Sequence, residues 1–119
     1  MQLVLSTRTI AGIMVVDCGG RLVFGDESGY LRETVKNLIP AYKQVVLNMK
    51  AVTYIDSGGL GTLVGLYSSL RACGGELKLA SLNARTLELL QITKLHTVFD
   101  VRDTEADAVV SFAKAAGAH

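Results

Sequence analysis

A carboxylate, a hydroxyl and three glycines lie within six consecutive residues, Asp56-Ser57-Gly58-Gly59-Leu60-Gly61. Apolar residues at helical spacing begin at Leu60, so the segment opens a helix and Ser57 is expected to be its cap. Glycine costs about 1 kcal/mol per helical position relative to alanine. Three glycines at one helix start therefore indicate a tight turn, or a place where another surface approaches the backbone.

Two interpretations of this segment are open. In the first, Asp56 and Ser57 only cap the helix and the glycines only make the turn. In the second, Ser57 is a modification site, because a phosphoryl group of about −1.5 to −2 charges is tolerated at the positive end of a helix dipole. The domain would then keep its fold while its surface changed from neutral to anionic, which would switch a partner on or off.

Catalysis by this chain is not indicated. A general base for Ser57 would have to be His96, expected at or near the surface, or His119, which lies in the tail 115–119 that we expect to fray. The hydrolase motif Gly-x-Ser-x-Gly fails because Ile55 stands two positions before the serine. The Gly-Lys-Ser/Thr of a phosphate loop is absent. We expect no enzymatic activity, no cofactor and no metal site.

The composition is that of a single globular domain over residues 1–119, with 50% hydrophobic and 19% charged residues. The net charge is +1, and no basic run favours direct binding of nucleic acid. The longest apolar stretch, Ile10–Val16, is far shorter than the roughly 20 residues of a membrane span, so we expect no membrane insertion and a cytoplasmic protein. Cys18 and Cys73 lack metal or redox spacing and are expected to be reduced, buried thiols.

Turn residues and hydrophobic spacing predict the elements that position Ser57. A hairpin of two strands is expected, one around Val4 and one from Gly12, with turns at Ala11-Gly12 and Gly19-Gly20. A helix follows from Ser28 and ends at Pro40; its apolar face is formed by Leu31, Val35, Leu38 and Ile39. The apolar run Val45–Met49 then predicts a strand covered on both faces, joined through Tyr54 and Ile55 to the helix at Ser57.

The second half of the chain continues the alternation of helix and strand. The helix after Ser57 ends at Cys73-Gly74-Gly75, and Glu76–Ala80 returns as a strand parallel to the one before it. Asn83 caps a short helix with Leu87 and Leu90. Thr104-Glu105-Ala106-Asp107 resembles a capping box that opens a last helix, with Val109, Val110 and Ala113 inward. The predicted fold is α/β, a mixed four- to five-stranded sheet packed with about four α-helices.

Several motifs together carry a resemblance to a known family. The valine-rich strand with Asn48, the segment Tyr54–Gly61 and the helix that ends in Gly74-Gly75-Glu76-Leu77 resemble the STAS domain of bacterial anti-sigma factor antagonists. The turn Gly20-Arg21-Leu22 and the segment Leu90–Leu95 are also similar to that family. The resemblance therefore covers roughly Gly12 to Ala113.

The resemblance implies a partner-switching protein. Unphosphorylated, it would bind an anti-sigma factor that is also a serine kinase and so free a sigma factor. The kinase would use ATP to phosphorylate Ser57, a metal-dependent phosphatase of the PP2C type would reverse this, and Asp56 would orient the serine. The expected partner-binding residues are Asp56, Gly58, Gly59, Leu60, Thr62, Arg21, Val23 and Phe24.

The identity of the partner is left open by the residues at two positions. Arg21 and Val23 stand where members of this family often have acidic residues. A second interpretation is a STAS scaffold bound to a transporter or a sensory assembly, in which Ser57 is only a cap and Val23, Phe24 and Leu60 form a constitutive docking surface. The sequence does not fix the oligomeric state.

Overall fold

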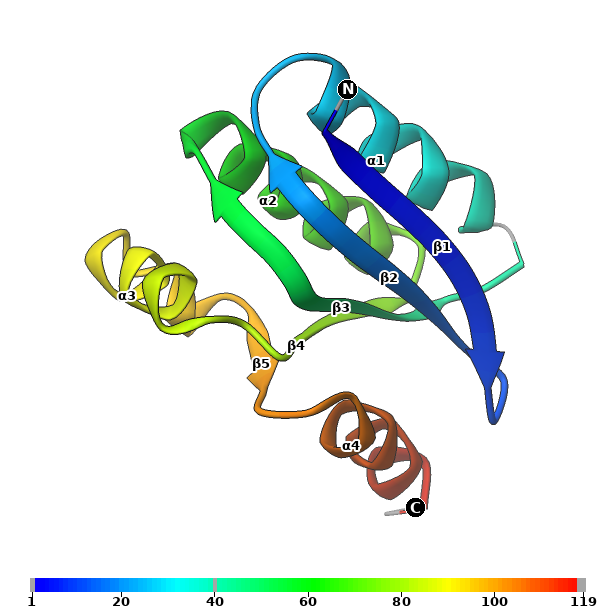
Figure 1. Ribbon diagram of the computed structural model, residues 1–119. Coiled ribbons are helices and arrows are strands. Elements are labelled where there is room, and N and C mark those ends of the chain that lie inside the picture. Colours follow the sequence, from blue (N-terminus) through cyan, green and yellow to red (C-terminus); the bar gives the residue numbers. More distant parts are fainter. Residues whose placement is uncertain (1, 40, 118–119) are drawn as a thin grey trace.

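The computed structural model describes residues 2–39 and 41–117, with side chains through Phe112. Within these residues the chain forms five strands, four α-helices and one short 3-10 helix (Figure 1). In chain order they are β1 (Leu3–Ile10), β2 (Ile13–Leu22), α1 (Asp26–Leu38), β3 (Gln44–Ile55), α2 (Ser57–Ala72), β4 (Glu76–Ala80), α3 (Ala84–Ile92), η1 (Leu95–Thr97), β5 (Asp100–Arg102) and α4 (Glu105–Gly117).

The five strands form one mixed sheet in the order β1-β2-β3-β4-β5. β1 and β2 are antiparallel and are joined at Ala11-Gly12, where both residues have positive φ, of 52° and 81°. Such a pair of left-handed residues is typical of the tight turn between two hairpin strands. The other neighbouring strands are parallel, including β3 and β4 on either side of α2. The predicted α/β class, the hairpin and the βαβ unit are therefore confirmed.

Two strands are longer than the sequence predicted. The prediction of a turn at Gly19-Gly20 is wrong, because β2 continues to Leu22 and stays paired with β3 as far as Ile55. Gly20 instead marks an irregularity in the register, with a φ of 93°. A side chain there would overlap the backbone oxygen of Gln2, so only glycine fits. The expected connection through Tyr54 is likewise the last part of a strand, β3.

The sheet separates two apolar cores. Met14 and Val16 of β2 point into the larger one, which α1 and α2 cover with buried leucines and valines; the two helices lie side by side on that face (Figure 1). Ile13 and Val15 alternate with them and point to the opposite face, where α4 packs. In β3, Val45 and Leu47 belong to the larger core and Val46 to the other, so the strand predicted over Val45–Met49 is buried on both faces, as predicted. The helix start predicted at Ser28 lies two residues after the observed one, and the predicted stop at Pro40 falls outside the described residues.

The inward face of the last helix differs in part from the predicted one. Ala108 and Phe112, four residues apart, are buried, and Val109 is partly buried and packs against the same core, as predicted, whereas Val110 is 48% exposed. A shift of two residues turns a helical side chain away from the sheet, which explains the error at Val110. The side chain of Ala113 lies outside the described residues, and so do residues 118–119 of the expected frayed tail, while α4 extends to Gly117.

The structure confirms two predicted helix caps and the predicted burial of one cysteine. The Asn83 side chain accepts the N–H of Thr86 at 2.8 Å, and the Thr104 hydroxyl accepts the N–H of Asp107 at 3.0 Å. Cys18 is buried, and burial raises the pKa of its thiol to about 12. Cys73 is exposed, so its predicted burial is wrong. It is the C-cap of α2, just before the chain enters β4.

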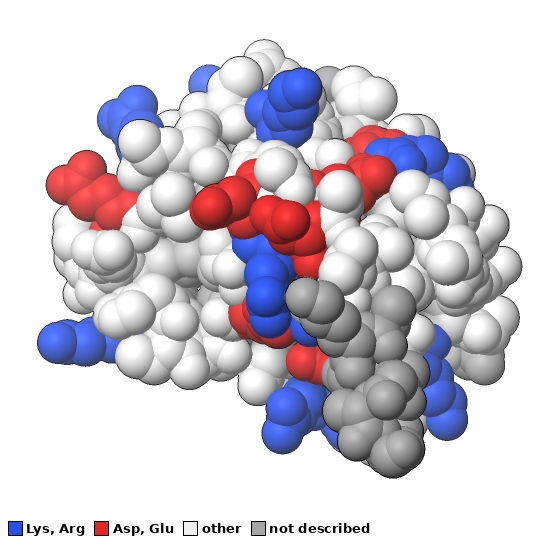
Figure 2. Space-filling model, turned by 90° about the horizontal axis from the view of Figure 1, so that it is seen from below, with Lys and Arg blue, Asp and Glu red and all other residues white. Residues whose placement is uncertain are grey.

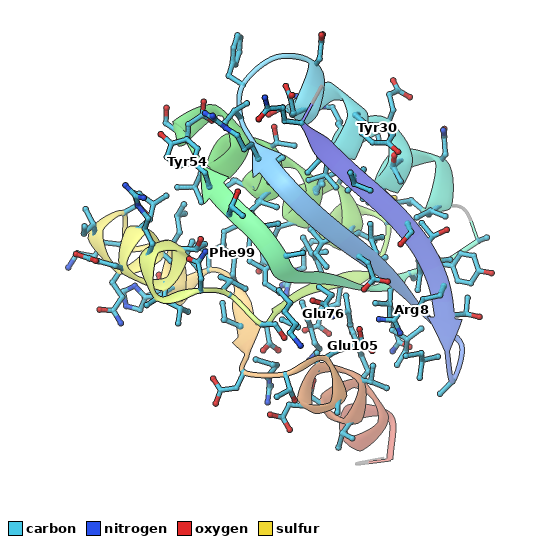
Figure 3. All side chains as sticks on the ribbon, in the orientation of Figure 1. Arg8, Tyr30, Tyr54, Glu76, Phe99 and Glu105 are labelled. Carbon is cyan, nitrogen blue, oxygen red and sulfur yellow. The ribbon has the colours of Figure 1, made fainter. Side chains whose placement is uncertain are left out.

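Charged side chains link α4 to the face of the sheet opposite α1 and α2. Arg8 of β1 pairs with Asp17 at 2.7 Å and with Glu105, whose carboxylate also accepts from the Asn48 side chain at 2.9 Å. Figure 3 labels Arg8 and Glu105, which face each other beneath the sheet, and Figure 2 shows acidic and basic side chains adjoining on this underside. These contacts hold the pKa of Glu105 below its ordinary value, chiefly through the hydrogen bond from Arg8.

The anchoring of α4 is expected to depend on pH. A carboxyl whose folded-state pKa is lowered stabilises the fold above its ordinary pKa of 4.5, and this contribution disappears as the pH falls through the folded-state pKa. We expect Glu105→Gln to cost about 1 kcal/mol at pH 7, since the exposed part of Arg8 is screened by water. Urea unfolding of both proteins should show this difference at pH 7 and a smaller difference at pH 3. An equal difference at both pH values would contradict the assignment.

Candidate functional site

The site lies at the carboxyl ends of the parallel strands β2 and β3 (Figure 1). β2 leads there into a short loop, residues 23–25, before α1, and β3 leads through Asp56 into α2. Because the two strands are paired as far as Leu22 and Ile55, the loop and the start of α2 are neighbours. This edge of an open parallel sheet is where α/β proteins place their binding sites.

Asp56, not Ser57, caps α2. Asp56 has an extended backbone and its Oδ1 accepts the N–H of Gly59 at 2.8 Å, while Ser57 is the first residue of the helix. The prediction that Ser57 is the cap is therefore wrong by one position. Serine and aspartate are both good caps, and the backbone conformation at residue 56 decides between them. Among the described residues the Ser57 hydroxyl has no hydrogen-bond partner, and the residue is exposed.

The carboxylate of Asp56 also holds the neighbouring loop. Both of its oxygens lie 3.1 Å from the backbone nitrogen of Phe24, which donates to them. The N–H groups of Gly59 and Phe24 lower the pKa of Asp56, with that of Gly59 the largest cause, so the side chain is ionised at neutral pH. Asp56 thus positions the start of α2 against the loop, and its carboxylate bonds to backbone N–H groups rather than to Ser57.

The three glycines of the segment differ in how much space surrounds them. A Cβ on Gly58 would lie 2.9 Å from Cα of Phe24, and a Cβ on Gly59 would lie 2.9 Å from the carbonyl carbon of Leu22. Both positions are needed for the close packing of α2 on the chain itself, so the predicted approach of an outside surface does not explain them. A Cβ on Gly61 would meet nothing within 4 Å. Gly61 is the position where added bulk tests partner contact without disturbing the fold.

The structure places the predicted partner-binding residues at very different depths. Phe24 is 81% exposed, Arg21 is exposed, and Val23 is partly buried. Leu60 and Thr62 are only 5% and 6% exposed, and Gly59 is also buried. Leu60 belongs to the large core, and its predicted role in a docking surface remains an untested prediction. The exposed side chains at this end of the sheet include those of Ser57, Phe24 and Arg21.

A groove between α1 and α2 begins beside Ser57. It has a volume of about 550 Å³, with Gly58, Gly61 and Gly65 of α2 along one side and the basic residues Arg32 and Lys36 of α1 on the other. This basic pair was not predicted from the sequence. Its signal was the i, i+4 spacing on the polar face of a predicted helix, which places two like charges together.

The remaining candidates do not join the site. His96 is exposed on η1, as expected, and its Nδ1 lies 3.4 Å from the backbone oxygen of Leu90. His119 lies outside the described residues. No group of three or more metal-ligating side chains occurs among the residues whose side chains are described. In the same part of the chain, no helix has the length and apolar character to cross a membrane.

Comparison with known proteins establishes the family. The STAS domain family matches residues 5–108, and the chain belongs to it. An anti-sigma-B factor antagonist of Listeria monocytogenes is 33% identical over 90 residues, which cover 71% of this chain and 79% of that protein. The anti-sigma-B factor antagonist of Bacillus subtilis is 37% identical over 71 residues, which cover 60% of this chain and 65% of the relative, slightly under two thirds of its length. The resemblance found in the sequence is confirmed.

Solved structures share the fold. The anti-sigma factor antagonist SpoIIAA, in its unphosphorylated form, has a TM-score of 0.72 and 16% sequence identity, over 93% of this chain and 98% of that one. The Bacillus cell fate determinant SpoIIAA in the phosphorylated form has a TM-score of 0.72 and 19% identity, over 92% of this chain and 99% of that one. At these identities the likeness shows the fold alone.

Proposed function

We propose that this chain is an anti-sigma factor antagonist that works by partner switching. In its unphosphorylated form it binds an anti-sigma factor with serine kinase activity, and this frees a sigma factor. Phosphorylation of Ser57 by that kinase ends the binding, and a PP2C-type phosphatase restores it. The family match and the relatives named anti-sigma-B factor antagonists support the choice of partner.

The observation that carries the proposal is the freedom of the Ser57 side chain. Asp56 performs the capping, so the exposed hydroxyl of Ser57 is not needed to hold the helix start. A structural role as the cap is thereby removed, and an exposed hydroxyl at the first helical position is accessible to a kinase. This combination favours modification over the interpretation in which Ser57 only caps α2.

A phosphoryl group at Ser57 is compatible with the fold and disruptive to a partner. It would lie at the positive end of the α2 dipole, where about two negative charges are tolerated. Moving a complex from 99% to 1% bound takes about 5.5 kcal/mol of differential affinity. An unpaired phosphate buried in an interface supplies several kcal/mol through desolvation and repulsion. The neighbouring exposed Phe24 gives that interface an apolar anchor next to the switch.

The test is mass spectrometry of the protein recovered from its native cells during growth and under stress. We expect a gain of about 80 Da, one phosphoryl group, on the peptide that contains Ser57, with an occupancy that changes between the two conditions. Modification of another serine, or none in any condition, would contradict the proposal. That result would favour the unphosphorylated scaffold bound to a transporter or a sensory assembly.

A further inference from the structure

Two arginines lie over one tyrosine next to Ser57. The guanidinium of Arg21, at the end of β2, is 5.2 Å from the centre of the Tyr54 ring, and that of Arg85, near the start of α3, is 5.8 Å from it. Arg21 and Tyr54 are paired residues of neighbouring strands, whereas Arg85 comes from a helix further along the chain. Figure 3 labels Tyr54 at the end of β3, on the side of the sheet where α3 lies.

These two positive charges are not neutralised by close ion pairs. Among residues 2–39 and 41–112, whose side chains are described, no carboxylate lies within 4.0 Å of either guanidinium. The pKa of Glu27 is lowered chiefly by the backbone N–H of Gln2, which its carboxylate accepts at 2.8 Å, and to a lesser degree by Arg21. The two guanidiniums therefore remain available to an outside carboxylate.

An apolar groove adjoins the charges. It lies between the end of β3 and α3, has a volume of about 310 Å³, and is lined by Tyr54, Arg85, Glu88, Leu89 and Ile92, among others. Ile92 is 70% exposed and Tyr54 is 37% exposed. A branched aliphatic side chain so open to water, beside an aromatic ring and two cations, gives a surface of mixed character. Arginine and tyrosine are enriched among the residues that dominate binding interfaces.

The surface is close enough to Ser57 to share one interface with it. Tyr54 precedes Ser57 by three residues, and three extended residues span at most about 11 Å. A typical interface covers about 800 Å² on each partner, and the diameter of such an area exceeds this separation. A protein that covers Ser57 therefore also reaches Tyr54 and its two arginines.

We propose that the Arg21, Tyr54 and Arg85 side chains, with the groove along α3, are a specificity-determining dock for an acidic segment of the anti-sigma factor. This inference rests on the proposed function. Carboxylates of the partner bind the two guanidiniums, and an apolar side chain near them packs against Leu89 and Ile92. Charge complementarity identifies the occupant, because two guanidiniums and the single carboxylate of Glu88 leave the surface positive.

The experiment measures binding of this chain to purified anti-sigma factors cloned from the genome that encodes it. The variant Arg21→Glu/Arg85→Glu is compared with the wild type by titration calorimetry at low and high salt. The expected result is a loss of about 100-fold in affinity at low salt, and a weaker salt dependence than that of the wild type. Circular dichroism and thermal unfolding verify that the variant is folded.

The chain offers a matched control. Arg71, near the end of α2, also lies over a tyrosine ring, with its guanidinium 5.7 Å from the centre of Tyr67. Arg71→Glu makes the same change of charge per residue, half of that in the double variant, and removes the same kind of stacking at the opposite end of the helix from Ser57. Its affinity for the anti-sigma factor is expected to stay within about twofold of the wild type, a difference near the scatter of energies at independent sites.

Each contrary outcome has a distinct meaning. If the double variant and Arg71→Glu bind equally well, while Ser57→Asp loses binding, the dock is refuted and the proposed function remains. If no anti-sigma factor binds the wild type, both are refuted. Sedimentation of the free chain tests a second copy as the occupant: a wild-type dimer that Arg21→Glu/Arg85→Glu dissociates would overturn the assignment to an anti-sigma factor.

Discussion

Ser57→Asp is expected to weaken binding of the anti-sigma factor by about 100-fold, or about 2.7 kcal/mol, and to leave the fold intact. Ser57 is exposed and occupies the first position of α2, where a carboxylate interacts favourably with the helix dipole. Aspartate carries one charge and a phosphoryl group about two, so the variant reproduces only part of the effect of phosphorylation. Titration calorimetry with the purified partner measures the loss.

The control for this variant is Ser57→Ala. It removes the hydroxyl without adding charge, and since Asp56 caps the helix, neither the stability nor the affinity should change measurably. Thermal unfolding of all three proteins establishes that the fold is kept. Wild-type affinity in Ser57→Asp would show that Ser57 lies outside the interface and would contradict the proposed phosphorylation switch.

Gly59→Ala is expected to lower the free energy of unfolding by about 3 kcal/mol or more. The added methyl group would overlap the backbone oxygen of Leu22 and lie 2.9 Å from its carbonyl carbon. Neither backbone segment is free to move away, because Leu22 is paired with Ile55 in the sheet and Asp56 holds Gly59 through its cap. Urea unfolding measures the loss of stability.

Gly61→Ala is the matched control for that prediction. It lies two residues further along the same helix, and its added Cβ would meet nothing within 4 Å. The substitution is expected to stabilise the protein by up to about 1 kcal/mol, because alanine is the better helix former. A Gly59→Ala variant as stable as Gly61→Ala would contradict the close packing of α2 on β2.

Hydrophobic spacing was enough to predict most of the fold. The apolar residues of α2 recur at helical spacing, and the run from Val45 to Met49 is apolar on both faces, so helix and buried strand were distinguishable from the sequence. The lengths of β2 and β3 could not be predicted from the sequence. A Gly-Gly pair has the composition of a turn, and only pairing with a neighbouring strand shows that Gly20 is an irregularity within β2.

The site was predictable in position but not in detail. The segment from Asp56 to Gly61 identified the start of α2, whereas the choice between two adjacent capping residues depends on one backbone conformation. The contacts of Asp56 with Phe24 and of Arg85 with Tyr54 join residues about thirty positions apart. Spacing along a sequence carries no signal for such contacts, because they arise only when the sheet brings the strand ends together.

Adding ATP to the purified complex of this chain and its anti-sigma factor tests the switch most directly. Phosphorylation is followed by intact mass and peptide mapping, and dissociation by size-exclusion chromatography of the same samples. We expect one phosphoryl group to appear on Ser57 and the complex to dissociate at the same rate. A complex that persists after Ser57 is fully phosphorylated, or that dissociates while Ser57 is unmodified, would contradict the proposed switch.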